Sequence, residues 1–143
     1  MSILDELARK LVICGYTLVL SDWRETITSC RRGVAPLLGL IEEKRDVSGW
    51  YAADKAVGKA AAALYAVLGV AGVYACRISE AGLAMLRKCG IAAVYDSLVP
   101  VMKDRSGNGI CPMEDATADL ASPEECLEAI KKKAALLAAR TTR

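Results

Sequence analysis

The first third of the chain alternates between helical and strand-like spacing of its hydrophobic residues. Apolar positions recur at helical intervals after Ser2, which predicts a first helix over residues 2–12. Two short β-prone runs, at 16–20 and 26–29, predict a hairpin. A second helix is expected over 35–44, because a proline suits the first turn of a helix and apolar residues follow Pro36.

Between Trp50 and Ile78 the polar positions are sparse. Trp50 begins a short apolar stretch that ends at Asp54, and Asp54 is the natural N-cap of a very apolar helix over 55–68. Gly69 then ends that helix. The sequence therefore predicts that this helix is covered on most of its sides.

Two mainly apolar runs, at 73–78 and 91–95, predict buried strands. The helix between them is expected to begin after Ser79 and to run to about Lys88, with Gly90 as its terminator. Alternation of helices with wholly apolar strands is typical of parallel βαβ units. The pattern thus predicts an α/β fold.

The C-terminal part of the chain contains a turn-rich segment and a long helix. Turn-forming residues cluster at 106–109. Ser122 is followed three residues later by Glu125, which is the spacing of a capping box and predicts a final helix over 123–139. The basic end of this helix suits the negative end of its dipole.

The composition is typical of one globular domain. Of the 143 residues, 54% are hydrophobic and 25% are charged, so a single domain over residues 1–143 is expected. The mean hydropathy of +0.28 and the Ala-rich helices indicate that another copy covers part of the apolar surface. We therefore expect a homo-oligomer.

Charge and histidine content exclude several classes of function. The 19 Lys and Arg and 17 Asp and Glu leave a net charge of +2, which argues against nucleic acid as a partner because nucleic-acid binding depends on excess positive charge. The chain has no histidine. This absence removes Ser-His-Asp triads, Cys-His dyads and His zinc sites.

The six cysteines show no metal-binding motif. No two of them have CxxC spacing, so neither a metal nor another cofactor is expected. No secretory signal precedes the first predicted helix, and glycines interrupt the longest weakly polar run, at 60–76. The sequence predicts reduced thiols, a cytoplasmic protein and no membrane association.

The segment from Asp54 to Lys59 breaks several preferences of a helix start. Within the predicted helix, Lys55 and Lys59 place two like charges on one face at the positive end of the dipole, and Gly58 weakens the helix. A phosphate or carboxylate held at this N-terminus would offset all three penalties. The alternative is that the lysines pair with carboxylates such as Glu80, Asp96 or Glu114, and that Gly58 permits close packing.

Two other segments contain candidate binding or catalytic residues. Ser79 and Glu80 begin a helix at the exit of a parallel strand, where ligands gather in α/β sheets, although a Ser cap with Glu in the first turn is also ordinary helix chemistry. Cys111 precedes Pro112 at a predicted helix start, where a thiol gains reactivity. A buried, inert Cys111 is the alternative.

Four blocks of sequence, in a fixed order, cover most of residues 18–116. They are RRGVAPLLGLIE at 31–42, ADKAVGKAAA at 53–62, VYACRISEAGLAML at 73–86 and YDSLVPVMKDRSGNGICPMED at 95–115. At these residues the chain resembles a family of small prokaryotic proteins classed as a domain of unknown function, whose fold is similar to that of the cytidine deaminases. The resemblance implies a three-layer α/β/α sandwich around a mixed sheet of about five strands.

The resemblance also implies what the site lacks. In working deaminases, zinc and its activated water lie between two helix N-termini that supply His or Cys ligands and a Glu. The corresponding places here are Ala53-Asp54-Lys55 and residues 78–82, so the resemblance implies that the zinc ligands are missing and that zinc-dependent deamination is absent. The resemblance further implies that the cleft between the two helix N-termini is retained in this chain.

Three hypotheses of function follow. The first is a zinc-free, deaminase-like domain that binds a small anionic ligand, such as a nucleotide. The second is a metal-independent enzyme that uses Cys111 with help from Glu80 or Glu114, and the third is a non-catalytic oligomerisation or adaptor module. Arg31 and Arg32 either add positive charge to the pocket or form a solvated loop. The candidate ligand-binding residues are Asp54, Lys55, Gly58, Lys59, Ser79, Glu80 and Glu114.

Overall fold

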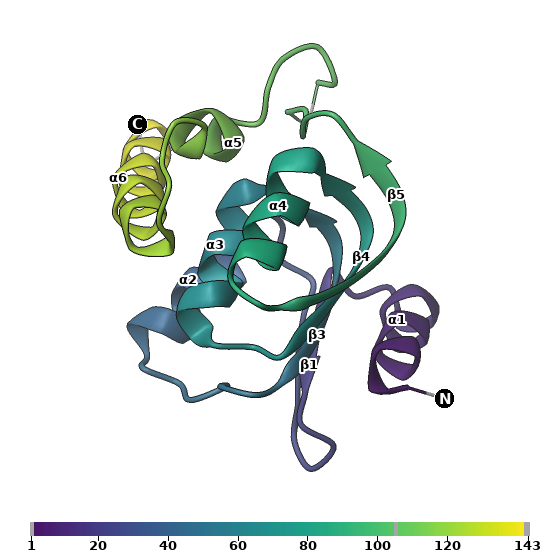
Figure 1. Ribbon diagram of the computed structural model, residues 1–143. Helices are drawn as coiled ribbons and strands as arrows, with labels where there is room; N and C mark the ends of the chain where they lie inside the picture. Colours follow the sequence, from purple (N-terminus) through teal and green to yellow (C-terminus); the bar gives the residue numbers. More distant parts are fainter. Residues whose placement is uncertain (1, 105, 142–143) are drawn as a thin grey trace.

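A mixed five-stranded sheet, in the order β2-β1-β3-β4-β5, forms the centre of the molecule (Figure 1). The computed structural model describes residues 2–104 and 106–141. β1 is antiparallel to both of its neighbours, whereas β3, β4 and β5 are parallel. β2 therefore runs in the same direction as β3 to β5, and these four strands end at the same edge of the sheet. The strands are β1 Leu18–Ser21, β2 Thr26–Ser29, β3 Tyr51–Val57, β4 Gly72–Ser79 and β5 Ala92–Val99.

Helices cover both faces of the sheet (Figure 1). One face packs against α1, and the other against α2, α3 and α4. The short α5 and the long α6 pack against α3, on the side away from the sheet. The helices are α1 Ile3–Cys14, α2 Ala35–Glu42, α3 Lys59–Leu68, α4 Glu80–Lys88, α5 Pro112–Thr117 and α6 Pro123–Thr141. The expected α/β fold with a mixed sheet of five strands is confirmed.

Each face of the sheet has its own hydrophobic core. Leu4, Leu7 and Leu11 share one stripe of α1 and pack against Val19 and Tyr74. The larger core lies on the opposite face and includes Ala60 to Leu64, which are buried on every side of α3. This apolar part of α3 needs cover on every side, and the sheet, α2, α4, α5 and α6 supply it.

Most elements lie where the hydrophobic pattern predicts them. The hairpin, the first two helices, the strands near 73–78 and 91–95 and the helix from Glu80 to Lys88 are confirmed. Ser79 caps α4, because its Oγ accepts a hydrogen bond from the Gly82 N–H at 3.0 Å. The final helix starts as predicted at Pro123 but runs to Thr141 rather than 139.

The predicted start of the third helix is wrong. Residues 51–57 form β3, and α3 begins only at Lys59 with Gly58 as its N-cap. Asp54 and Lys55 therefore lie in a strand. The short apolar stretch from Trp50 continues into a strand because β1 and β4 pair with it on both sides, and this pairing outweighs the helical propensity of the Ala and Lys residues.

The last helix is an integral part of the packed fold. Cys126 and Ile130 are fully buried between α6 and the larger core. Ser122 caps α6, because its Oγ accepts from the Glu125 N–H at 3.1 Å. Within the described part of the chain, no helix is both long and apolar enough to cross a membrane.

Candidate functional site

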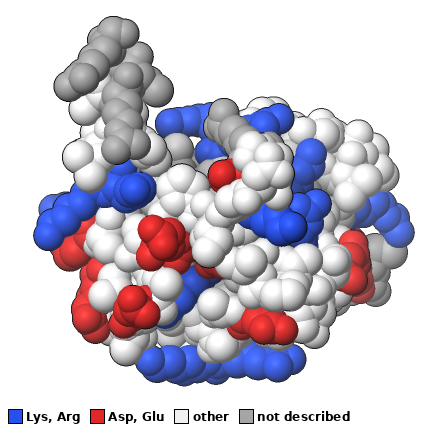
Figure 2. All heavy atoms as spheres, turned by 90° about the horizontal axis from the view of Figure 1, so that it is seen from above, with Lys and Arg blue, Asp and Glu red and all other residues white. Residues whose placement is uncertain are grey.

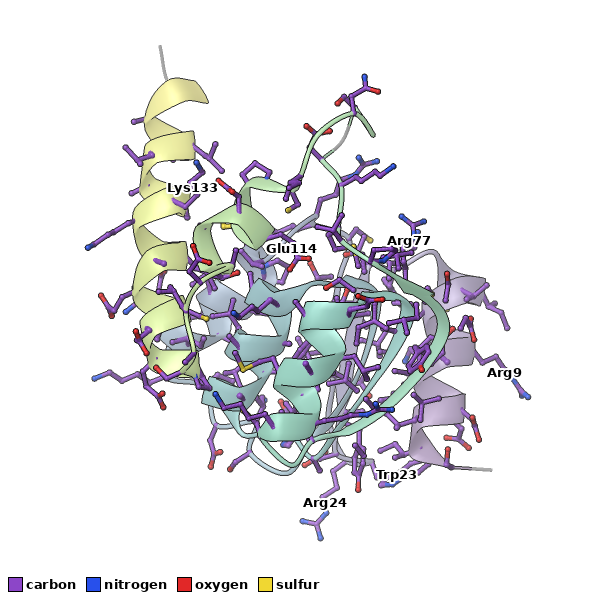
Figure 3. All side chains as sticks on the ribbon, turned by 45° about the horizontal axis from the view of Figure 1, so that its top comes forward. Arg9, Trp23, Arg24, Arg77, Glu114 and Lys133 are labelled. Carbon is purple, nitrogen blue, oxygen red and sulfur yellow. The ribbon has the colours of Figure 1, made fainter. Side chains whose placement is uncertain are left out.

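A buried carboxylate occupies the N-terminus of α3. Glu114, on α5, is 6% exposed. One of its oxygens accepts a hydrogen bond from the Lys59 N–H at 2.5 Å, and the other accepts from the Met102 N–H at 3.2 Å. Figure 3 shows this side chain directed from α5 toward the body of the molecule. The protein itself thus supplies a carboxyl group to this N-terminus, through backbone N–H groups and not through the lysine–carboxylate pairs that were the alternative in the sequence analysis.

Gly58 makes this approach of Glu114 possible. A Cβ at residue 58 would lie 2.8 Å from the Glu114 Oε1 atom, so any side chain there would displace the Glu114 carboxyl group. Gly82 has a similar role, because a Cβ there would lie 2.8 Å from the Val57 carbonyl oxygen. These two glycines bring the beginnings of α3 and α4 together. Gly58 is an N-cap and not an interior helix residue, so the predicted cost of a helical glycine does not apply.

Asp54 has a structural partner in the core. Its carboxylate accepts a hydrogen bond from the Tyr65 hydroxyl at 2.6 Å and one from the Ala56 N–H at 3.3 Å. Burial raises the pKa of Asp54 to about 6, although both hydrogen bonds oppose that rise. Burial and the neighbouring carboxylate raise the pKa of Tyr65 well above its usual range. Asp54 therefore links β3 to α3 and does not cap a helix.

Lys55 and Lys59 do not share a helix face, which corrects the prediction made from their spacing. Lys55 is exposed in β3, and its N–H donates to the Thr17 carbonyl. Lys59 is half-buried in the first turn of α3, and its ammonium donates to the Ala118 carbonyl at 3.1 Å. Within residues 2–104 and 106–141, neither lysine forms an ion pair. The predicted i, i+4 pairing of the two lysines on one helix is wrong, because Lys55 belongs to β3 and Lys59 to α3.

Among the described residues, the other candidate side chains form no hydrogen bond or ion pair with Lys59 or Glu114. Ser79 is fully buried and its hydroxyl serves as a cap, while Glu80 is exposed in the first turn of α4. Cys111 is half-buried at the N-cap of α5 and its side chain makes no capping hydrogen bond. No hydrogen bond connects the Cys111 thiol to Glu80 or Glu114 in the part of the chain described. Arg31 and Arg32 are exposed.

A hollow between α4 and the segment joining α5 to α6 is the best candidate for a binding site. We call it the α4 groove. It is an open hollow of about 270 Å³, lined by Lys59, Ala81, Ala84, Met85, Lys88, Leu120 and Ala121. The Lys88 ammonium donates to the Ala121 carbonyl at 2.7 Å, just as the Lys59 ammonium donates to the Ala118 carbonyl. Two ammonium groups therefore border one mainly apolar hollow.

Sequence reasoning found Lys59 but missed Lys88. Lys88 lies in the last turn of α4, where a cation is ordinary helix chemistry. Its distance of 29 residues from Lys59 gives no periodic signal, and only the folded chain brings both to residues 118–121. Among the described residues, no group of three or more Cys, Asp or Glu side chains is arranged to hold a metal ion.

Comparison with known proteins supports this architecture. A crystal structure of a DUF1893 family protein (TM1506) from Thermotoga maritima is similar to this chain, with a TM-score of 0.84 and 24% sequence identity. The similarity covers 92% of this chain and 89% of that one. Among curated proteins, none matches the chain significantly. The model of one family, Domain of unknown function (DUF1893), matches residues 6–134. The chain therefore belongs to the DUF1893 family.

Proposed function

We propose that this protein binds a small anionic ligand in the α4 groove. The observation that carries the proposal is the placement of Lys59 and Lys88 on the border of one hollow. Each ammonium uses one donor on a backbone carbonyl, at Ala118 and Ala121 respectively. An ammonium has three donors, so both lysines keep hydrogen-bonding capacity for a ligand.

The lining of the groove indicates the class of ligand. Ala81, Ala84 and Met85 offer an apolar wall on α4, which suits a flat or aliphatic body. The volume of about 270 Å³ is small for a ligand pocket. A phosphate ester or carboxylate of modest size, such as a nucleoside monophosphate, fits this combination better than a dinucleotide does.

The proposal includes a cytidine-deaminase-like fold without the zinc chemistry. The strand order and the close N-termini of α3 and α4 support that likeness. The groups at these N-termini do not fit a zinc ion: Ser79 caps its own helix, and both oxygens of Glu114 accept from backbone N–H groups. We therefore derive no metal-dependent step, and the proposed function is binding.

Thermal-shift measurements with and without ligand test the proposal. Inorganic phosphate, phenyl phosphate and a nucleoside monophosphate are compared with the uncharged nucleoside. A ligand at 100 times its Kd stabilises the folded state by about 2.7 kcal/mol. We expect an anion-dependent shift that Lys59→Met and Lys88→Met each reduce strongly.

Lys10→Met is the matched control. It removes the same charge from an exposed lysine of α1 that does not line the groove, so the shift should be retained. Because Lys59 and Lys88 also hold the α5–α6 segment, the variants are first compared without ligand by circular dichroism. A ligand shift that survives both groove substitutions, in variants that remain folded, would contradict the proposal.

A further inference from the structure

Four exposed cations gather at the edge of the sheet where its parallel strands end. We call Arg31, Arg32, Lys55 and Arg77 the basic ledge. Arg31 and Arg32 follow the end of β2, Lys55 lies near the end of β3, and Arg77 lies near the end of β4. Figure 2 views the molecule from this end and shows basic side chains gathered near its middle.

Backbone pairing places the main chains of Arg31, Lys55 and Arg77 on neighbouring strands, along one edge of the sheet. The Arg31 carbonyl accepts from the Thr17 hydroxyl at 2.6 Å, and the Thr17 carbonyl accepts from the Lys55 N–H at 3.2 Å. On the next strand, Arg77 pairs in register with Ala56, the neighbour of Lys55. Adjacent strands lie about 4.8 Å apart, so the row from β2 to β4 extends over ~14 Å.

The cations of the basic ledge are not neutralised by the folded chain. Within residues 2–104 and 106–141, none of the four forms an ion pair. Two carboxyl groups lie along the row, and each accepts a hydrogen bond within the fold: Asp54, next to Lys55 on β3, accepts from the Tyr65 hydroxyl, and Asp96, on β5, accepts from the Tyr74 hydroxyl. Away from this edge of the sheet, acidic residues gather on or beside α5 and α6, namely Asp115, Asp119, Glu124, Glu125 and Glu128.

We propose that the basic ledge binds a flexible chain of phosphates, as presented by single-stranded nucleic acid or by inorganic polyphosphate. Its cations are spread along a line, so a compact anion reaches only one or two of them, whereas a linear polyanion reaches them all. Affinity then comes from the release of counterions condensed on that polyanion. A folded acidic partner would need buried apolar area, which these four exposed side chains do not offer.

This inference is independent of the α4 groove, which shares none of the four residues. It also revises the expectation that nucleic acid is not a partner. The net charge of +2 is a sum over the whole chain. The acidic residues around α5 and α6 offset the positive charge of the basic ledge in that sum, so the sum does not show the local excess of positive charge.

Fluorescence anisotropy with a labelled 20-nucleotide oligo(dT) tests the inference. Four phosphate contacts on a single strand predict that log K falls with log salt concentration with a slope of about −3. In the variant R31Q/K55Q/R77Q we expect binding at least tenfold weaker and a slope closer to zero by about 2. Unlabelled inorganic polyphosphate should compete with the oligonucleotide, which would show that bases are not required.

A second triple variant, K131Q/K132Q/K133Q, is the matched control. It makes the same change in net charge on α6, and Figure 3 shows Lys133 far from Arg77. We expect it to bind oligo(dT) like the unmodified protein, and R31K/R77K should retain most of the binding. Equal weakening in both triple variants, unchanged binding in the ledge variant, or equally good competition by polyglutamate of matched charge would overturn the inference.

Discussion

Asp54 shows how a single buried carboxyl group influences the stability of this fold. Its pKa is raised to about 6 in the folded protein, against about 3.9 in an unfolded chain. The folded state therefore holds the proton more tightly than the unfolded state between these two values. The contribution of Asp54 to stability is largest below pH 4 and is lost as the pH rises through 6.

Asp54→Asn removes this dependence. The amide oxygen can still accept the hydrogen bond from the Tyr65 hydroxyl, but the cost of burying a charge disappears. At pH 7 we expect the variant to be more stable than the unmodified protein by ~1–3 kcal/mol, with the difference shrinking toward pH 4. Thermal melts of both proteins from pH 4 to 8 measure this difference. A constant difference across that range would refute the explanation.

Gly58 leaves room for the Glu114 carboxylate at the start of α3 because it has no side chain. Gly58→Ala would press a methyl group against the Glu114 carboxylate, and the N–H groups of Lys59 and Met102 would lose their acceptor. We expect a loss of ~1–3 kcal/mol in the free energy of unfolding. In a Glu114→Ala background the same substitution should cost much less. Denaturant titration of the four proteins gives the coupling energy, and simple additivity would contradict the proposed contact.

At the scale of elements, the caps of α4 and α6 offer a direct comparison. Ser79 is fully buried and caps α4, whereas Ser122 caps α6 nearer the surface. Replacing a Ser cap by Ala costs about 0.5–2 kcal/mol. We expect Ser79→Ala near the upper end of this range and Ser122→Ala near the lower end, because water can replace the cap only at Ser122. Chemical denaturation of both variants measures the two losses in the free energy of unfolding. A larger loss in Ser122→Ala than in Ser79→Ala would contradict this expectation.

At the scale of the whole molecule, α6 completes the larger core. Ile130 is fully buried, while Leu136 on the same helix is 58% exposed. Ile130→Ala should therefore cost ~2–5 kcal/mol, and Leu136→Ala should change stability little. Equilibrium unfolding of both variants measures this contrast. Similar losses in the two variants would show that the face of α6 that packs against α3 is assigned wrongly.

Homo-oligomerisation stays a prediction at this scale. It was inferred from the mean hydropathy of +0.28 and the Ala-rich helices, but much of that alanine lies in α3, which α6 and the other helices of the same chain cover. Light scattering of the purified protein tests it. A monomer at all concentrations would show that the apolar composition serves the internal cover of α3 alone.

The hydrophobic pattern by itself determined most of the elements of this protein. Ser79 with its following helix, the hairpin and the apolar strands near 73–78 and 91–95 follow from local chemistry, since caps, turns and periodicity act over a few residues. The C-terminal helix followed from Ser122 and Glu125 for the same reason. These features need no knowledge of distant contacts.

Only the tertiary structure decided where Asp54 and Lys55 belong and what lies at the start of α3. Strand pairing on both sides converts a predicted helix start into part of β3, and Glu114 reaches Lys59 across 55 positions of the chain. The pairing of Lys59 with Lys88 around one groove arises in the same way. Each of these depends on contacts between segments distant in sequence, and the spacing of residues along a chain carries no record of such contacts.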